Sequence, residues 1–174
     1  MNIEYVKSVI RNVPDFPKPG IQFKDITTAL KDPKALSFMI DHLYEYYKDK
    51  GITKVAGIES RGFIIGPALA ARLGAGFVMI RKPGKLPADT IQKSYALEYG
   101  EDTIEMHKDA IGENDVVLVH DDLLATGGTA LAALELVQEV GAKSVLVNFL
   151  IELAFLDGTA RLSSAEDVYA MIKY

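Results

Sequence analysis

The sequence predicts an α/β fold with a doubly wound, mainly parallel sheet flanked by helices. Short apolar runs bounded by glycine recur along the chain, and segments with helical spacing separate them. The length of 174 residues suits one domain that buries its own core. We therefore expect a single domain over residues 1–174.

The first fifty residues predict two helices joined by a loop. Apolar residues at helical spacing indicate a short helix over residues 3–13. Three prolines and a glycine within residues 14–20 then favour a stiff loop. A long amphipathic helix is expected from Pro33 until shortly before Gly51.

The next segment predicts a strand–helix–strand unit. Apolar strands are expected over residues 54–58 and 76–80, and a helix closed by Gly74 is expected over residues 62–73. A right-handed crossover of this kind makes the two strands parallel.

An exposed basic loop is expected over residues 81–93, because four basic residues occur there without periodicity. Alternating residues then predict a hairpin with strands over 95–99 and 102–107. The remaining expected elements are a buried strand over 116–119, a helix over 129–140, and strands over 144–151 and 168–172.

Composition excludes several classes of function. The chain has no cysteine, which excludes disulfide scaffolds and cysteine nucleophiles, and its three histidines lack zinc-ligand spacing. A net charge of −5 disfavours nucleic acid and anionic membranes as partners. Because no apolar run approaches the ~20 residues of a bilayer span, we expect a cytoplasmic protein.

The most informative stretch begins at the end of the 116–119 strand. Asp121 and Asp122 come first, and Ala125, Thr126, Gly127, Gly128 and Thr129 then open a helix. Backbone N–H groups at a helix N-terminus suit a phosphate, and two carboxylates suit sugar hydroxyls or Mg²⁺, so this stretch predicts a ribose 5-phosphate site. In the structural alternative, the aspartates cap the helix and the glycines form a tight turn. No Walker-type GxxxxGK[ST] motif occurs.

The 121–129 run resembles the phosphoribosyl pyrophosphate (PRPP) motif of type I phosphoribosyltransferases. Other segments resemble the adenine-specific members of that family, namely residues 15–27, 57–63, 81–87 with 94–100, and 151–158. The resemblance implies the type I phosphoribosyltransferase fold, with a base-binding hood over about residues 1–33 and a flexible catalytic loop over about residues 81–99. It also implies the reaction of adenine with PRPP to give AMP and pyrophosphate in purine salvage, with Mg²⁺ as cofactor.

The resemblance assigns PRPP to two groups of residues. Asp121 and Asp122 would hold the ribose hydroxyls, and residues 125–129 would hold the 5-phosphate. The expected pyrophosphate contacts are Glu59, Ser60, Arg61, Gly62, Arg81, Lys82 and Lys85, some of which would reach a neighbouring subunit. Mg²⁺ would be carried by PRPP or pyrophosphate near the two aspartates, with no dedicated protein site.

The same resemblance assigns the base and the chemistry. Phe23 and Leu123 would sandwich adenine, and Gln22 and Lys24 would read its edge through backbone groups. Glu98 would take the proton lost by the purine, Arg61 would supply charge, and Tyr99 would belong to a lid.

Each assignment has a structural alternative. Phe23 suits a core anchor, Glu98 suits an exposed acid in a hairpin, and the basic residues suit solvated loops. His120 interrupts the family pattern before the two aspartates. It is expected to pack or to bond to a backbone carbonyl, although carboxylates beside an imidazole could raise its pKa.

Two other functions stay open. One is a phosphoribosyltransferase for another base, such as hypoxanthine, guanine, xanthine or orotate. The other is a PRPP-sensing regulator, which the acidic charge and the lack of a basic recognition helix disfavour. The family resemblance further implies a homodimer.

Overall fold

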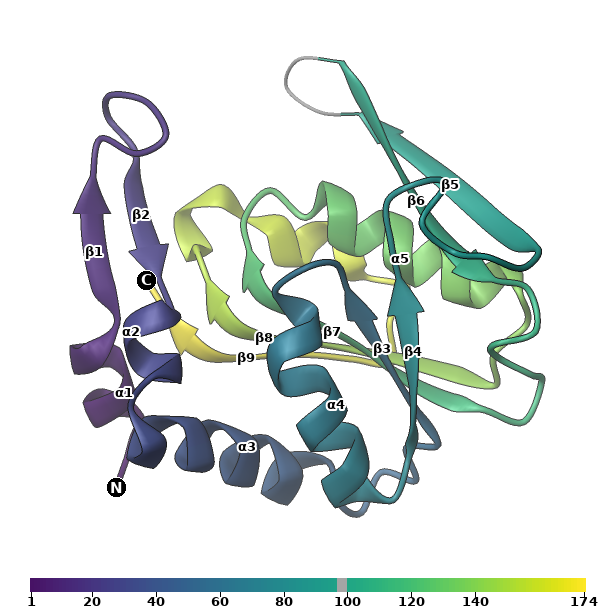
Figure 1. Ribbon diagram of the computed structural model, residues 1–174, viewed down its shortest axis with the longest axis horizontal. Coiled ribbons are helices and arrows are strands. Elements are labelled where there is room, and N and C mark those ends of the chain that lie inside the picture. The colour runs from purple at the N-terminus through teal and green to yellow at the C-terminus, as the bar shows by residue number, and fades with distance from the viewer. Residues whose placement is uncertain (97–99) are drawn as a thin grey trace. The chain divides into compact units, whose positions relative to one another are not determined.

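The structure is a computed structural model that describes residues 1–96 and 100–174 (Figure 1). It divides into two compact units, residues 1–45 and 46–174. Within the described residues, no helix has the length and apolar character needed to cross a bilayer.

The N-terminal unit contains a strand pair that the sequence did not predict. Its elements are α1 (Ile3–Val9), β1 (Arg11–Pro14), β2 (Gln22–Asp25), α2 (Thr27–Leu30) and the first part of α3 (Pro33–Tyr47). The helix expected over residues 3–13 is too long, because the backbone becomes extended at Ile10 and β1 follows. The loop expected over 14–20 is the connection of an antiparallel hairpin, in which Arg11 pairs with Asp25 at 2.5 Å.

Pro14 explains why this hairpin is hard to predict. A proline lacks the N–H that a central strand needs, so it argues against a strand in the sequence. A two-stranded sheet consists only of edge strands, where that missing donor costs little.

The C-terminal unit is built on the predicted parallel sheet. Five parallel strands lie in the order β4-β3-β7-β8-β9. Their bounds are β3 (Lys54–Ile58), β4 (Gly76–Ile80), β7 (Val116–Leu124), β8 (Ser144–Glu152) and β9 (Asp167–Lys173). The strand–helix–strand unit is confirmed, since β3, α4 (Gly62–Leu73) and β4 have the expected bounds.

Helices cover both faces of this sheet, which confirms the doubly wound class (Figure 1). The face that carries Val119 and Val147 packs in one apolar cluster with α5 (Gly128–Glu139). His120, the next residue along β7, points to the other face, where a Cβ at Gly66 of α4 would lie 3.5 Å from its ring. Two short 3₁₀ turns, Ala154–Leu156 and Gly158–Leu162, join β8 to β9.

A separate antiparallel hairpin, β5 (Thr90–Ala96) with β6 (Glu101–His107), projects beside α5 (Figure 1). The predicted hairpin is confirmed over its described residues, but its first strand begins at Thr90 rather than at Tyr95. The expected unstructured loop over 81–93 is therefore wrong in its last four residues. Residues 97–99 of the predicted first strand lie outside the described residues. Lys93 lies 3.2 Å from Glu135 of α5, so a basic side chain that suggested a solvated loop instead contacts a helix.

Candidate active site

The acid pair, Asp121 and Asp122, lies inside β7 rather than after it. The expected strand ended at residue 119, but pairing with β8 continues to Leu124 opposite Glu152. Charged residues disfavour strands, which is why the sequence pattern ended early. Both aspartates line the same pocket at this end of β7.

The phosphate loop, residues 125–129, follows β7 directly and opens α5. Gly127 has φ +82°, a conformation that favours glycine, and a Cβ there would lie 2.6 Å from the carbonyl oxygen of Gly158. A Cβ at Gly158 would in turn overlap the carbonyl oxygen of Ala125. Close backbone packing from the segment after β8 therefore supports this loop, whose N–H groups open the twelve-residue helix α5.

Asp122 forms an ion pair with Arg61. Its Oδ2 lies 2.6 Å from Nε of Arg61, the residue that precedes α4, and the Asp122 side chain is only 5% exposed. The Arg61 side chain is 46% exposed. The ion pair thus holds the Arg61 guanidinium at its Nε, while the Arg61 side chain stays accessible to solvent and ligands.

Asp121 is electrostatically unlike its neighbour. Burial, followed by the charge of Asp122, raises the pKa of its carboxyl well above 3.8. A raised pKa means that the free protein disfavours a charge at this position. A ligand that offers hydroxyl donors or a cation would stabilise that charge.

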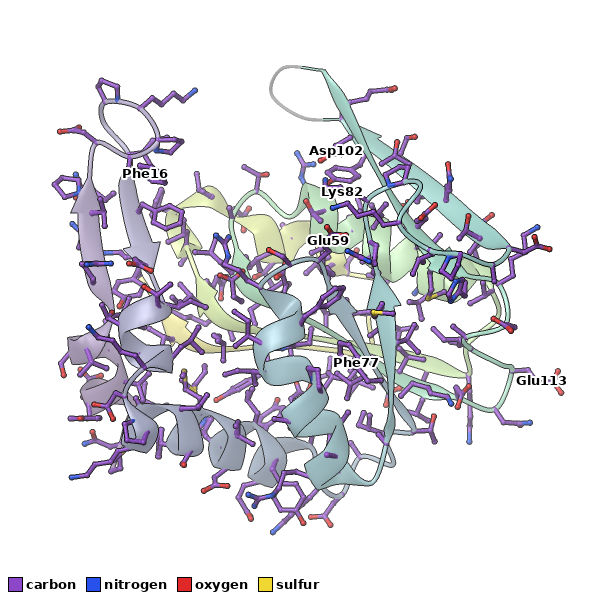
Figure 2. The ribbon with its side chains drawn as sticks, in the orientation of Figure 1. Phe16, Glu59, Phe77, Lys82, Asp102 and Glu113 are labelled. Carbon is purple, nitrogen blue, oxygen red and sulfur yellow. The ribbon has the colours of Figure 1, made fainter. Side chains whose placement is uncertain are left out.

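The cation cluster, defined as Arg81, Lys82 and Lys85 with the carboxylates of Glu59 and Asp102, lies at the base of the hairpin. Glu59 accepts hydrogen bonds from Arg81 Nε at 3.1 Å and from the backbone N–H of Lys82 at 3.0 Å, and it pairs with Lys85. Lys82 pairs with Asp102 of β6. Figure 2 shows Glu59, Lys82 and Asp102 close together beside β5 and β6.

These pairings control the charge of Glu59. Burial opposes its ionisation, but hydrogen bonds from Lys85, Lys82 and Arg81 outweigh burial and lower the pKa of its carboxyl to about 2. The cations of the cluster are thus already paired with carboxylates of the chain itself. Glu59 and Ser60 are joined by a cis peptide bond.

Two pockets meet at the acid pair. One, of about 220 Å³, is lined by Glu59, Arg81, Lys82, Asp102 and other residues of the cation-cluster side. The other, of about 190 Å³, is lined by Arg61, Asp122 and the phosphate loop. Asp121 and Thr129 line both. The arrangement suits a ligand with an anion at each end and a polar centre.

His120 lies beneath this site and has a structural environment. It is fully buried, and its Nδ1 lies 2.5 Å from Oδ1 of Asn148 on β8, so its partner is a side-chain amide and not a backbone carbonyl. Burial lowers the pKa of the imidazole, against the opposing effects of Asn148 and Asp122. The suggestion that neighbouring carboxylates raise this pKa is wrong, because desolvation is the larger effect.

Most expected PRPP contacts gather in the C-terminal unit. Arg61, the acid pair and the phosphate loop line the two pockets together with Glu59, Arg81 and Lys82. Lys85 reaches the site only through its pair with Glu59, and Ser60 and Gly62 adjoin Arg61. Sequence reasoning missed Tyr95 and Asp102, which lie opposite each other in the hairpin register. Strand alternation could have paired them, but nothing in the sequence connects the pair to Lys82.

The expected adenine contacts are divided between the units. Gln22, Phe23 and Lys24 form most of β2 in the N-terminal unit, where Phe23 packs edge-to-face with Phe16 at 5.2 Å. Leu123 lies on β7 in the other unit. That residues of the two units bind one base together stays a prediction.

The two residues expected to act in chemistry and closure, Glu98 and Tyr99, lie outside the described residues. Among residues 1–96 and 100–174, no group of three or more His, Cys, Asp or Glu side chains could hold a metal ion.

Comparison with known proteins connects this geometry to a family. Residues 26–172 match the phosphoribosyl transferase domain. Adenine phosphoribosyltransferase of Phocaeicola vulgatus is 63% identical over 168 residues, which cover 97% of this chain and 95% of the relative.

Solved structures agree with that match. The enzyme of Giardia lamblia, complexed with 9-deazaadenine, superposes with a TM-score of 0.94 at 43% identity over 100% of this chain and 98% of that one. The Saccharomyces cerevisiae enzyme, complexed with an imino-altritol bisphosphate and adenine, gives 0.91 at 39% identity over 98% of each chain. The chain belongs to the phosphoribosyltransferase family and, within it, to the adenine phosphoribosyltransferases.

Proposed function

We propose that this chain transfers the 5-phosphoribosyl group of PRPP to adenine and so forms AMP and pyrophosphate. The single observation that carries the proposal is the pair of pockets that share Asp121 and Thr129. PRPP has a phosphate, a pentose and a pyrophosphate in a row, and this order fits a phosphate loop, an acid pair and a cation cluster. The similarity to adenine phosphoribosyltransferases supports adenine as the acceptor.

PRPP binds with its 5-phosphate on the backbone N–H groups of residues 125–129. Asp121 and Asp122 accept hydrogen bonds from the ribose hydroxyls, which stabilise the carboxylate of Asp121. Residues 59–62 and the cations Arg81, Lys82 and Lys85 contact pyrophosphate. Arg61 and these cations stabilise charge as the bond to the anomeric carbon breaks.

Mg²⁺ fits this site as a substrate-borne ion. Carboxylate and phosphate oxygens are ligands that Mg²⁺ prefers, and Asp121 is the carboxylate that lines both pockets. Asp121 and Asp122 would lie beside the ion without forming an all-protein cage. When bound, the ion supplies positive charge that stabilises the departing pyrophosphate.

Adenine is held by Phe23 and Leu123, with Gln22 and Lys24 at its edge. The bound 9-deazaadenine and adenine of the Giardia and yeast enzymes support a purine site in such proteins. Glu98 accepts the proton that the purine loses. A catalytic loop over about residues 81–99, including Tyr99, closes over the ligands and excludes water, the competing nucleophile.

A base panel tests this function. Purified protein, PRPP and Mg²⁺ are incubated with adenine, hypoxanthine, guanine, xanthine or orotate in turn, and the nucleotides are separated and quantified. We expect AMP from adenine and no nucleotide from hypoxanthine. The reverse pattern would reject the base specificity, and no product with any base would reject the reaction.

Assembly and location complete the proposal. We propose a homodimer, which is what the resemblance to the family implies. Light scattering coupled to size exclusion would measure its mass. The proposed location is the cytoplasm, which cell fractionation tests.

A further inference from the structure

The hydroxyl of Tyr95 lies where the phosphate loop, the hairpin and the cation cluster meet. Tyr95 is on β5, directly opposite Asp102 on β6. Its Oη lies 3.1 Å from Oγ1 of Thr129, 3.1 Å from Oδ2 of Asp102 and 3.4 Å from Nζ of Lys82. A single partly buried hydroxyl therefore bonds to three side chains from three different segments.

The direction of each bond follows from what each group can donate. Lys82 can only donate, and the carboxylate of Asp102 can only accept, since the hydrogen bond from Lys82 lowers its pKa. The Tyr95 hydroxyl thus donates its one hydrogen bond to Asp102. Its oxygen accepts from Lys82 and from Thr129, so the donor and both acceptor positions of the hydroxyl are used.

This arrangement fixes the ammonium of Lys82. Lys82 donates one hydrogen bond to Asp102 and another to Tyr95, all three residues line the same pocket, and within residues 1–96 and 100–174 the third N–H of Lys82 has no side-chain partner. Burial alone would lower the pKa of Lys82, but Asp102 and Tyr95 raise it, so the side chain stays a cation. An oriented cation gives up less rotamer freedom when an anion binds.

The ring of Tyr95 is set independently of its hydroxyl. A Cβ at Gly128 would lie 3.5 Å from Cδ2 of Tyr95, so the ring lies beside the start of α5, and Tyr95 packs against the apolar cluster of that helix. Thr129, also in the first turn of α5, anchors the hydroxyl. The Tyr95 hydroxyl therefore links the ammonium of Lys82 to Thr129 of the phosphate loop.

We propose that Tyr95 is a positioning residue that acts through Lys82, aiming its ammonium at the pyrophosphate of PRPP. This inference rests on the proposed function, because it takes the 220 Å³ pocket as the pyrophosphate side. It adds a residue to the site without placing Tyr95 in contact with substrate.

A double-mutant cycle tests the inference. The dissociation constants of pyrophosphate with Mg²⁺ and of ribose 5-phosphate are measured by calorimetry for the wild type, Tyr95→Phe, Lys82→Gln and the double variant. Tyr95→Phe keeps the ring and removes only the hydroxyl. We expect it to weaken pyrophosphate binding about 3- to 10-fold and to change ribose 5-phosphate binding less than 2-fold.

The second half of the cycle separates positioning from folding. In the Lys82→Gln background, Tyr95→Phe should have no further effect on pyrophosphate, because its route of action is gone. Thr103→Val is the matched control. It removes an exposed hydroxyl bond to Ser94 in the same hairpin, at 2.9 Å, and should leave both dissociation constants unchanged.

Equal losses for both ligands, or an additive effect in the Lys82→Gln background, would overturn the inference while leaving the proposed function intact. An unchanged pyrophosphate affinity in Tyr95→Phe would overturn it as well. A wild-type protein that binds neither ligand and forms no AMP would overturn the proposed function, and the inference with it.

Discussion

The phosphate loop and the cation cluster border pockets that share Asp121 and Thr129, yet they differ in the source of their positive charge. Residues 125–129 offer backbone N–H groups at the start of α5, held by backbone packing against Gly158. The cation cluster offers the side chains of Arg81, Lys82 and Lys85, each already paired with a carboxylate.

This difference matches the fates of the two ends of PRPP. The 5-phosphate stays on the nucleotide throughout the reaction, so a fixed cradle that needs no rearrangement suits it. The pyrophosphate must be bound and then released, and carboxylates that take the cations back favour release. The comparison predicts that the two ends can be damaged separately.

The largest expected effect touches neither end. Glu98→Gln removes the proposed proton acceptor and should lower kcat by about 10²- to 10⁴-fold. The affinities for ribose 5-phosphate and for pyrophosphate should stay within 2-fold, which would separate chemistry from binding. Steady-state kinetics and calorimetry measure the two effects, and unchanged turnover would remove Glu98 from the mechanism.

Gly127→Ala damages the phosphate loop. A Cβ at φ +82° and 2.6 Å from the carbonyl of Gly158 forces the loop to move. Ribose 5-phosphate should bind roughly 30-fold more weakly, given ~1–2 kcal/mol for the backbone conformation and more for the overlap, while pyrophosphate binding stays within 2-fold.

Gly141→Ala is the control for that variant. Gly141 has φ +90° just after the same helix, but a Cβ there meets nothing within 4 Å. It should lower stability by about 1 kcal/mol and leave ribose 5-phosphate binding unchanged. Equal losses of binding in both variants would mean that strain in α5, rather than loop geometry, governs the phosphate site.

Lys82→Gln damages the other end. Losing a charge-assisted hydrogen bond should weaken pyrophosphate binding by roughly 10-fold and leave ribose 5-phosphate binding unchanged. Product inhibition by pyrophosphate provides the measurement in the active enzyme. A loss confined to ribose 5-phosphate would reverse the assignment of the two pockets.

The smallest expected effect is on stability, where Glu59 and Asp121 should give pH dependences of opposite sign. The pKa of Glu59 is lowered to about 2, so its carboxylate stabilises the fold above pH ~4.5, and this contribution is lost as the pH falls toward 2. Asp121 has a raised pKa, so the folded protein binds a proton more tightly there, and stability falls as the pH rises above 3.8.

Urea unfolding between pH 2.5 and 7 measures both effects. The free energy of unfolding of the wild type should fall as the pH is lowered. In Glu59→Gln this fall should be smaller by about 1–2 kcal/mol, a figure that allows for solvent screening of the ion pairs. Asp121→Asn should instead stabilise the protein at neutral pH. If both substitutions changed the pH dependence of stability in the same direction, the electrostatic difference between Glu59 and Asp121 would be contradicted.

Local patterns predicted much of the fold. The bounds of β3 and β4 follow from apolar runs over residues 54–58 and 76–80. Most of β3 is buried in the parallel sheet, and β4 is its partly exposed edge strand. The start of β5 was missed, because its first residues include Gln92 and Lys93, polar residues that are typical of a loop. The end of β7 was missed, because Asp121 and Asp122 lie in a strand against the propensity of charged residues.

The candidate site also has a part that local sequence predicts and a part that it does not. The phosphate loop is contiguous in sequence, so its residues and their chemistry could be predicted together. The pairings of Glu59 with Lys85 and of Lys82 with Asp102 join segments about twenty or more residues apart. They depend on how the hairpin packs against the strand ends, which no local spacing encodes.

A crystal structure with PRPP and Mg²⁺, determined without a base, tests the central claim most directly. The account predicts the 5-phosphate on the backbone N–H groups of residues 125–129, the ribose hydroxyls at Asp121 and Asp122, and the pyrophosphate beside Arg81 and Lys82. A pyrophosphate seated on residues 125–129, or PRPP bound outside both pockets, would contradict it.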